Sequence, residues 1–170
     1  MQTDHPEEML YLVDDADVEV GSISRAEVYA NGIQNYRVIH AFICNDEGAL
    51  WIPRRTKTKK LFPLALDYSV AGHVAYGESY EETLIRETAE EVNLDLTDIP
   101  YQEIGHIGPA PDGVCAWQKV YEITYNDTPD YNRDDICESY WLTPTEALDM
   151  IAAGEPTKSD LGKLIKKYYG

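Results

Sequence analysis

Three glutamates in the middle of the chain have a spacing suited to binding a divalent cation. Glu87, Glu90 and Glu91 stand at i, i+3 and i+4, so their side chains are neighbours if the segment is helical. Like charges at this spacing repel and raise one another's pKa values, and a bound cation removes that cost. Carboxylate oxygens suit hard ions such as Mg2+ or Mn2+. The cluster predicts a site for such an ion; the alternative is a solvated acidic helix face, the commonest meaning of a charge run.

The surrounding sequence predicts the helix that would hold these glutamates. Ser79 and Glu82 have the spacing of a capping box, in which each side chain accepts from the backbone N–H of the other residue. We therefore expect a helix that begins near Tyr80. An apolar stripe with a period of 3.6 residues is expected to face inward. Its members are Tyr80, Leu84, Ile85, Thr88 and Val92. The glutamates are expected on a different face of the same helix.

Six residues of this region fit the spacing G-x5-E-x7-R-E-x2-E-E, and they are Gly72, Glu78, Arg86, Glu87, Glu90 and Glu91. The run over residues 72–94 resembles the Nudix box, the signature of enzymes that cut a diphosphate linked to another moiety. It departs from the family pattern at Thr88, where an aliphatic residue is usual, and at Asn93, where glycine is usual. The resemblance implies metal-dependent pyrophosphate hydrolysis and an α/β fold, a Nudix-type α/β/α sandwich with a mixed β-sheet.

The resemblance also implies a role for each residue of the box. Glu87 and Glu91 would bind the metal, and Glu90 would be a further ligand or the general base. In the family the carbonyl of the residue at Gly72 is often a ligand, and backbone without a Cβ can approach an ion closely. The arginine is expected to orient a glutamate, and Glu78 is a weaker candidate for a second metal. The residues expected to act in catalysis are Glu90, Arg86 and Glu78.

A basic segment precedes the box and is a candidate phosphate-binding site. Five of the fourteen basic residues lie within residues 54–60 of an otherwise acidic chain. Arginine offers a planar fork for phosphate oxygens and lysine a point charge. We expect Arg54, Arg55 and Lys59 to contact the substrate's diphosphate, with a solubilising loop as the alternative. His73 is expected to bind metal or phosphate, or else to fill the turn.

The resemblance extends over most of the chain and is closest to the isopentenyl-diphosphate-isomerase-like branch of the family. Isomerases of that branch carry a catalytic cysteine two residues before a histidine, a position that falls on Ala71 here. Alanine cannot donate or accept a proton, so the sequence favours a hydrolase of a nucleoside di- or triphosphate or similar small diphosphate. The second acid of the isomerases falls on Asp135, a candidate base or metal neighbour. A non-catalytic ligand-binding Nudix module is the other alternative.

Length and charge limit the remaining possibilities. The 170 residues suit a single Nudix domain over residues 1–170. The formal net charge of −17 argues against partners such as nucleic acid polymers and anionic membranes, and favours a small phosphorylated substrate. The N-terminus has neither a basic opening nor an apolar stretch, which favours the cytoplasm. Three scattered cysteines suit reduced thiols. A homodimer is compatible with the sequence.

The other elements read as strands with a few helices, which predicts a mixed sheet covered by helices. Two short strands predict an N-terminal hairpin over about residues 9–24, around a turn at residues 14–17 that is expected to be solvated. Residues 36–44 and 49–54 read as a buried hairpin. Residues 161–168 predict a final amphipathic helix.

Overall fold

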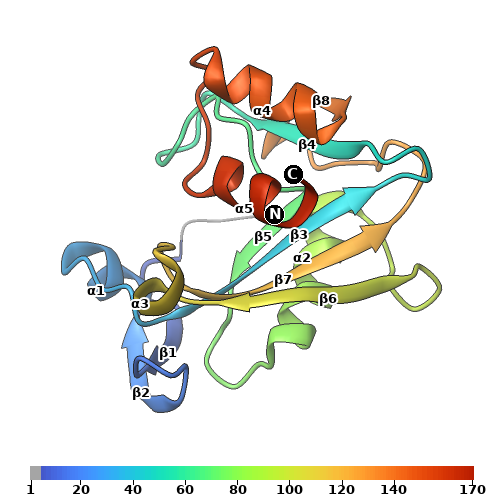
Figure 1. Ribbon diagram of the computed structural model, residues 1–170. Coiled ribbons are helices and arrows are strands. Elements are labelled where there is room, and N and C mark those ends of the chain that lie inside the picture. The colour runs from blue at the N-terminus through green and yellow to red at the C-terminus, as the bar shows by residue number, and fades with distance from the viewer. Residues whose placement is uncertain (1–4) are drawn as a thin grey trace.

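A mixed β-sheet with helices on both faces forms the centre of the molecule, as the computed structural model of residues 5–170 describes it (Figure 1). The strands of this sheet are β3 (Arg37–Cys44), β4 (Leu50–Arg55), β5 (Val70–His73), β6 (Tyr101–Ile107), β7 (Trp117–Thr124) and β8 (Ile136–Leu142). The helices are α1 (Arg25–Ala30), α2 (Tyr80–Val92), α3 (Pro109–Asp112), α4 (Pro144–Ala152) and α5 (Leu161–Tyr169). A separate antiparallel pair consists of β1 (Met9–Val13) and β2 (Glu19–Ser24). The predicted fold class is confirmed.

The sheet forks between β3 and β4. Strand order is β6-β7-β3-β4-β8, and β3 runs parallel to β7 along its whole length. On its other edge β3 pairs with β5, so β4 joins it only at Cys44 and Leu50. In the fork, the Ser69 hydroxyl accepts from the Ile43 N–H at 2.8 Å and donates to the Trp51 carbonyl at 2.6 Å. The expected hairpin of residues 36–54 therefore has its two strands, but they diverge because β5 occupies the edge of β3.

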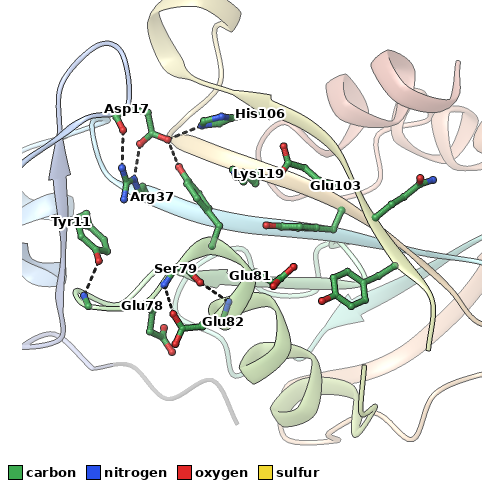
Figure 2. Close-up of a pocket in the computed structure, with 15 residues that line it drawn as sticks. Tyr11, Asp17, Arg37, Glu78, Ser79, Glu81, Glu82, Glu103, His106 and Lys119 are labelled. Carbon is green, nitrogen blue, oxygen red and sulfur yellow. Dashed lines mark hydrogen bonds and ion pairs between the residues drawn. The ribbon is translucent and has the colours of Figure 1, made fainter. Parts of the chain in front are cut away.

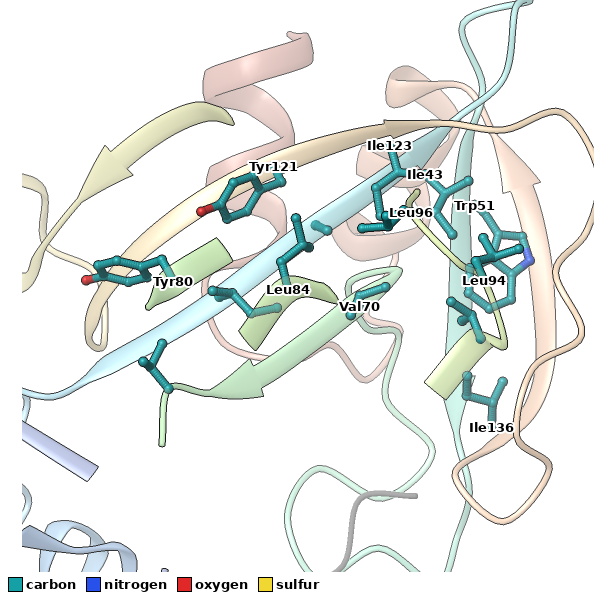
Figure 3. Packing of buried hydrophobic residues seen from close by; sticks show 14 residues of the cluster. Ile43, Trp51, Val70, Tyr80, Leu84, Leu94, Leu96, Tyr121, Ile123 and Ile136 are labelled. Carbon is teal, nitrogen blue, oxygen red and sulfur yellow. The ribbon is translucent and has the colours of Figure 1, made fainter. Parts of the chain in front are cut away.

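Alternate residues of β3 face two separate hydrophobic layers, as the period of a strand requires. Ile39, Ala41 and Ile43 pack in one cluster with the apolar residues of α2, which Figure 3 shows from close by. Phe42 and Cys44 face the other cluster, which includes residues of α4 and α5. No helix within residues 5–170 is long and apolar enough to cross a membrane.

Helix α2 begins where its local sequence predicts. The Ser79 hydroxyl accepts from the Glu82 N–H at 3.0 Å, and the Glu82 carboxylate accepts from the Ser79 N–H at 3.1 Å. The helix ends at Asn93 in the left-handed conformation, φ 53°. Asparagine tolerates that conformation better than most residues, which accounts for its replacing the family's usual glycine.

The predicted division of α2 into an apolar face and an acidic face is wrong in two places. Ile85 is 43% exposed, although it was expected to face inward. Glu87 and Glu91 are buried, on the side of the helix that carries Leu84 and Thr88. Positions 84, 87, 88 and 91 are i, i+3, i+4 and i+7, so they form one face. Two carboxylates thus belong to the inward stripe.

The turn between β1 and β2 is attached to the central sheet through Asp17. The side chain of Asp17 is 3% exposed, so the expectation of a solvated turn is wrong at this residue. Its carboxylate accepts from Arg37 Nε and from the Tyr80 hydroxyl and lies beside His106 Nε2, each at 2.7 Å. One carboxylate therefore joins the β1–β2 pair to β3, α2 and β6.

Candidate active site

Helix α2 places two buried carboxylates against the backbone of strand β5. Glu87 and Glu91 face β5, where the Ala71 N–H donates to Glu91 Oε2 at 3.3 Å. Gly72 lies so close to Glu87 that a Cβ on it would stand 2.5 Å from Glu87 Cγ and Cδ. Only glycine at position 72 therefore leaves Glu87 where it is.

The two carboxyl groups are in an environment that disfavours negative charge. Burial raises the pKa of Glu87 to about 7, against the opposing effect of Arg86. Burial also raises the pKa of Glu91 well above its usual value, and the nearby Glu87 and Asp67 carboxylates raise it further. Glu87 Oε2 is buried and has no hydrogen-bond partner among the described residues. A cation at this place would offset the cost of burying the two negative charges, and it would give Glu87 Oε2 a partner.

Arg86 links the other acidic residues of the box. Its guanidinium donates to both carboxylate oxygens of Glu78, each at 2.8 Å, in a bidentate pair. Its Nη1 donates to Glu87 Oε1 at 2.8 Å and lies 3.6 Å from Glu90 Oε2. Arg86 therefore fixes one oxygen of Glu87 and leaves Oε2 directed elsewhere.

The three box glutamates do not converge equally. The Glu90 side chain is 40% exposed, whereas Glu87 and Glu91 are buried. Across residues 5–170, no three acidic, histidine or cysteine side chains form a ready metal-binding group. The structure thus brings Glu87 and Glu91 together and places Glu90 at their solvent-exposed edge.

A narrow cavity of about 20 Å3 connects Glu91 with the basic segment. Its lining residues are Pro53, Arg55, Lys59, Asp67, Tyr68, Ser69, Glu91, Asp135 and Ile136. Lys59 Nζ lies 2.5 Å from Asp135 Oδ1, and Arg55 Nη1 lies 2.9 Å from Asp67 Oδ2. Arg55 and Lys59, which were expected to bind substrate, and Asp135, the candidate base or metal neighbour, are therefore gathered beside a box glutamate. The cavity has room for about one water molecule, so it marks where these groups meet and does not enclose a whole substrate.

The structure places Arg54 and His73 elsewhere. Successive residues of a strand point to opposite faces, and Arg54 points away from Arg55 to pair with Glu138 at 3.0 Å and Glu155 at 3.3 Å. The His73 ring stacks on Tyr36, with 5.8 Å between centroids, and its Nε2 lies 2.7 Å from the Tyr29 hydroxyl. Burial lowers the pKa of His73 well below its usual value. His73 thus fills space among aromatic rings.

A second, wider cavity of about 920 Å3 lies at the N-terminal end of α2 (Figure 2). Glu78 and Glu82 line it, but Glu87 and Glu91 do not. Among its other charged groups, Asp17 pairs with Arg37 at 2.7 Å, and Lys119 pairs with Glu103 at 3.1 Å. We therefore centre the candidate site on Glu87 and Glu91 and not on this wider cavity.

A family model described as NUDIX domain matches residues 35–164. The chain belongs to the Nudix family. Nudix hydrolases act on diphosphate bonds of small phosphorylated substrates and generally use a divalent metal.

Relatives support the same assignment along almost the whole chain. The Nudix hydrolase all7351 of Nostoc is 47% identical over 162 residues, which are 95% of this chain and 96% of the relative. The crystal structure of DR0079 from Deinococcus radiodurans superposes with a TM-score of 0.90 at 40% identity, covering 96% of this chain and all of that one. At lower identity, 29% over 157 residues, the chain resembles the isopentenyl-diphosphate Delta-isomerase of Salmonella arizonae, covering 86% of this chain and 83% of the relative.

The Nudix box of this chain fits a hard divalent cation. Its donors are carboxylate and carbonyl oxygens, which Mg2+ and Mn2+ prefer. Glu87 Oε2 has no hydrogen-bond partner among the described residues, and Gly72 has no Cβ that would crowd this carboxylate. Both buried carboxyl groups also have raised pKa values, which a cation would reverse.

Some residues of the site were missed by the sequence reasoning. Asp67, Tyr68 and Ser69 line the cavity beside Glu91, and Lys158 lies 3.5 Å from Asp67. The sequence patterns predict no site residue in the segment just before β5. A usable signal was the pair of polar residues Asp67 and Ser69 in a run that is otherwise apolar from Leu64 to Gly72.

Proposed function

We propose that the protein is a Mg2+- or Mn2+-dependent hydrolase of a diphosphate bond in a nucleoside di- or triphosphate or a similar small diphosphate, with water as the nucleophile. One observation carries this proposal: Glu87 and Glu91 are buried next to Gly72, with a carboxylate oxygen that has no partner in the described residues. We further propose that residues 1–170 form one domain acting in the cytoplasm. The net charge of −17 supports a small substrate over a nucleic acid polymer or a membrane.

The residues that would hold the metal are Glu87, Glu91 and the carbonyl of Gly72, with Glu90 as a further ligand or the general base. When bound, the ion would neutralise charge on the phosphate oxygens in the transition state and lower the pKa of a bound water. As the base, Glu90 would take the proton of the attacking water. Its partly exposed side chain can pass that proton on to solvent.

Arg86 acts through the carboxylates that it touches. Its bidentate pair with Glu78 anchors the guanidinium, so the bond to Glu87 Oε1 holds that carboxylate in one rotamer. A ligand held in one orientation loses less entropy on binding. Glu78 is therefore first an anchor for Arg86, and its proposed part in a second metal site depends on release of this pair.

An isomerase is the weaker alternative. Ala71 is buried and pairs with His40 of β3, and its methyl group can neither donate nor accept the proton that isomerisation must move. Burial lowers the pKa of His40 to about 3, so this neighbour is a poor proton donor near neutral pH.

The test is a panel of nucleoside di- and triphosphates, with isopentenyl diphosphate included, incubated with Mg2+, with Mn2+ and with EDTA. We expect orthophosphate or a nucleotide product only when a divalent ion is present, and oxygen from 18O-labelled water in the product. Conversion of isopentenyl diphosphate into its isomer, or turnover in EDTA equal to that in Mg2+, would contradict the proposal.

Replacing Gly72 with alanine tests the close approach at β5. The added Cβ would stand 2.5 Å from Glu87 Cγ and Cδ, so Glu87 must move. We expect the affinity for Mn2+, measured by electron paramagnetic resonance, to fall about 10- to 100-fold, as when a ligand's support is removed. Gly21→Ala is the matched control, because that strand glycine has nothing within 4 Å of the added atom. Equal Mn2+ affinities of the two variants would argue against a metal at Glu87.

A further inference from the structure

The segment between α4 and α5 lies beside the chain that leads into the candidate site. The Leu66 N–H donates to the Pro156 carbonyl at 2.8 Å, and the Lys158 N–H donates to the Leu66 carbonyl at 2.9 Å. The Tyr68 hydroxyl donates to the Ser159 carbonyl at 2.9 Å. These bonds hold the backbone of Lys158 next to Asp67 and Tyr68, two residues of the cavity that also contains Glu91.

The Lys158 side chain directs its charge toward Asp67, one of the residues that line that cavity. Its Nζ lies 3.5 Å from Asp67 Oδ1, the one ion pair that it makes within residues 5–170. With 21% of its side chain exposed, Lys158 is accessible from solvent and not sealed in the core.

Lys158 makes fewer contacts within the described residues than either arginine of the basic segment. Arg54 is bound to Glu138, Glu155 and the Leu64 carbonyl. Arg55 is bound to Asp67 and to the carbonyls of residues 61 and 62. An ammonium has three N–H donors, and the single contact of Lys158, at 3.5 Å, is longer than a hydrogen bond.

We propose that Lys158 binds the diphosphate of the substrate beside Glu91. The inference rests on the proposed function, because it assumes a diphosphate at the box carboxylates. An ammonium held at one edge of this acidic site gives a phosphate oxygen a charge-assisted hydrogen bond. Asp67, which pairs with both Lys158 and Arg55, is then a positioning residue for the two cations.

The competing explanation is that Lys158 only neutralises the buried Asp67. The two explanations predict different results for a double variant. If Lys158 were only a counter-charge, Asp67→Asn would remove the need for it, and Lys158→Met/Asp67→Asn would recover both stability and ligand affinity. If Lys158 binds phosphate, the double variant recovers stability but not affinity.

The experiment measures binding of methylenediphosphonate, a diphosphate analogue that cannot be hydrolysed at its bridge, by calorimetry in excess Mg2+. We expect Lys158→Met to raise its Kd about 10- to 100-fold, the usual effect of losing a hydrogen bond to a charged group. Lys158→Arg should stay within a few-fold of the wild type. Lys166→Met, on the exposed side of α5, is the matched control and should leave Kd unchanged.

The outcomes separate this inference from the proposed function. A Kd of Lys158→Met equal to that of Lys166→Met, recovery of affinity in the double variant, or failure of the wild type to bind the analogue would overturn the role of Lys158. Since binding needs no turnover, a wild type that binds through Lys158 but hydrolyses nothing would support the inference while refuting the hydrolase. For an active wild type, we expect Lys158→Met to raise KM more than it lowers kcat.

Discussion

Replacing Glu91 with glutamine should lower kcat for the best diphosphate substrate about a thousandfold. A bound ion supplies several kcal/mol of transition-state stabilisation, and about 1.4 kcal/mol corresponds to a tenfold change in rate. Glutamine keeps the shape of Glu91 and can still accept from the Ala71 N–H, but it lacks the charge that holds the cation. Steady-state kinetics over a range of Mg2+ concentrations measures the effect.

The matched control for this substitution is Glu81→Gln. Glu81 lies on the same helix but is exposed, and it is not one of the six residues that define the box pattern. We expect its kcat to stay within twofold of the wild type. If Glu91→Gln retained more than a tenth of wild-type activity at saturating Mg2+, the assignment of Glu91 as a metal ligand would fail.

The metal-free protein should become more stable as the pH falls from 8 to 5. The folded-state pKa of Glu87 is raised from 4.5 to about 7, so the folded protein takes up a proton more readily than the unfolded chain. The stabilisation from this proton is complete below the unfolded pKa and is lost as the pH rises through about 7. From that shift, the free energy of unfolding at pH 8 is lower by on the order of 3 kcal/mol than it is with Glu87 protonated.

Urea unfolding in EDTA measures this change, and Glu87→Gln isolates the contribution of one carboxyl from all other titrating groups. We expect the difference in unfolding free energy between the wild type and this variant to grow from pH 5 to pH 8 in favour of the variant. Mg2+ at pH 8 should stabilise the wild type and have little effect on the variant. A difference that stays constant with pH would show that Glu87 is not held in a charge-disfavouring site.

Local features of the site were predictable because they depend on neighbours in sequence. The Ser79 and Glu82 capping box fixes the start of α2 wherever the helix packs. The box spacing likewise places Glu87 and Glu91 one turn apart. The inward direction of these two carboxylates follows from their register with Leu84, because positions 84, 87 and 91 share one face of a helix.

Features that depend on distant segments were not predictable. Alternation implies that Arg54 and Arg55 point to opposite faces, but which of them meets Glu91 is decided by how β4 pairs with β8 and diverges from β3. Asp67 and Lys158 form an ion pair although more than half of the sequence separates them. No local pattern of one sequence carries information on such a contact.

The fork in the sheet makes the spacing of its two halves depend on one short stretch of the chain. Separating β3 from β7 would break pairing along eight residues, from Arg37 to Cys44, whereas β3 and β4 are joined at Cys44 and Leu50 and by the hydroxyl of Ser69. One short stretch of chain, residues 65–73, spans the gap between the two halves. The Arg55 N–H donates to the Ala65 carbonyl and the Asp67 N–H to the Pro53 carbonyl, each at 2.9 Å, and β5 pairs with β3 on the other side. Changes confined to this stretch can therefore alter the spacing of the two halves while the β3–β7 and β4–β8 ladders stay intact.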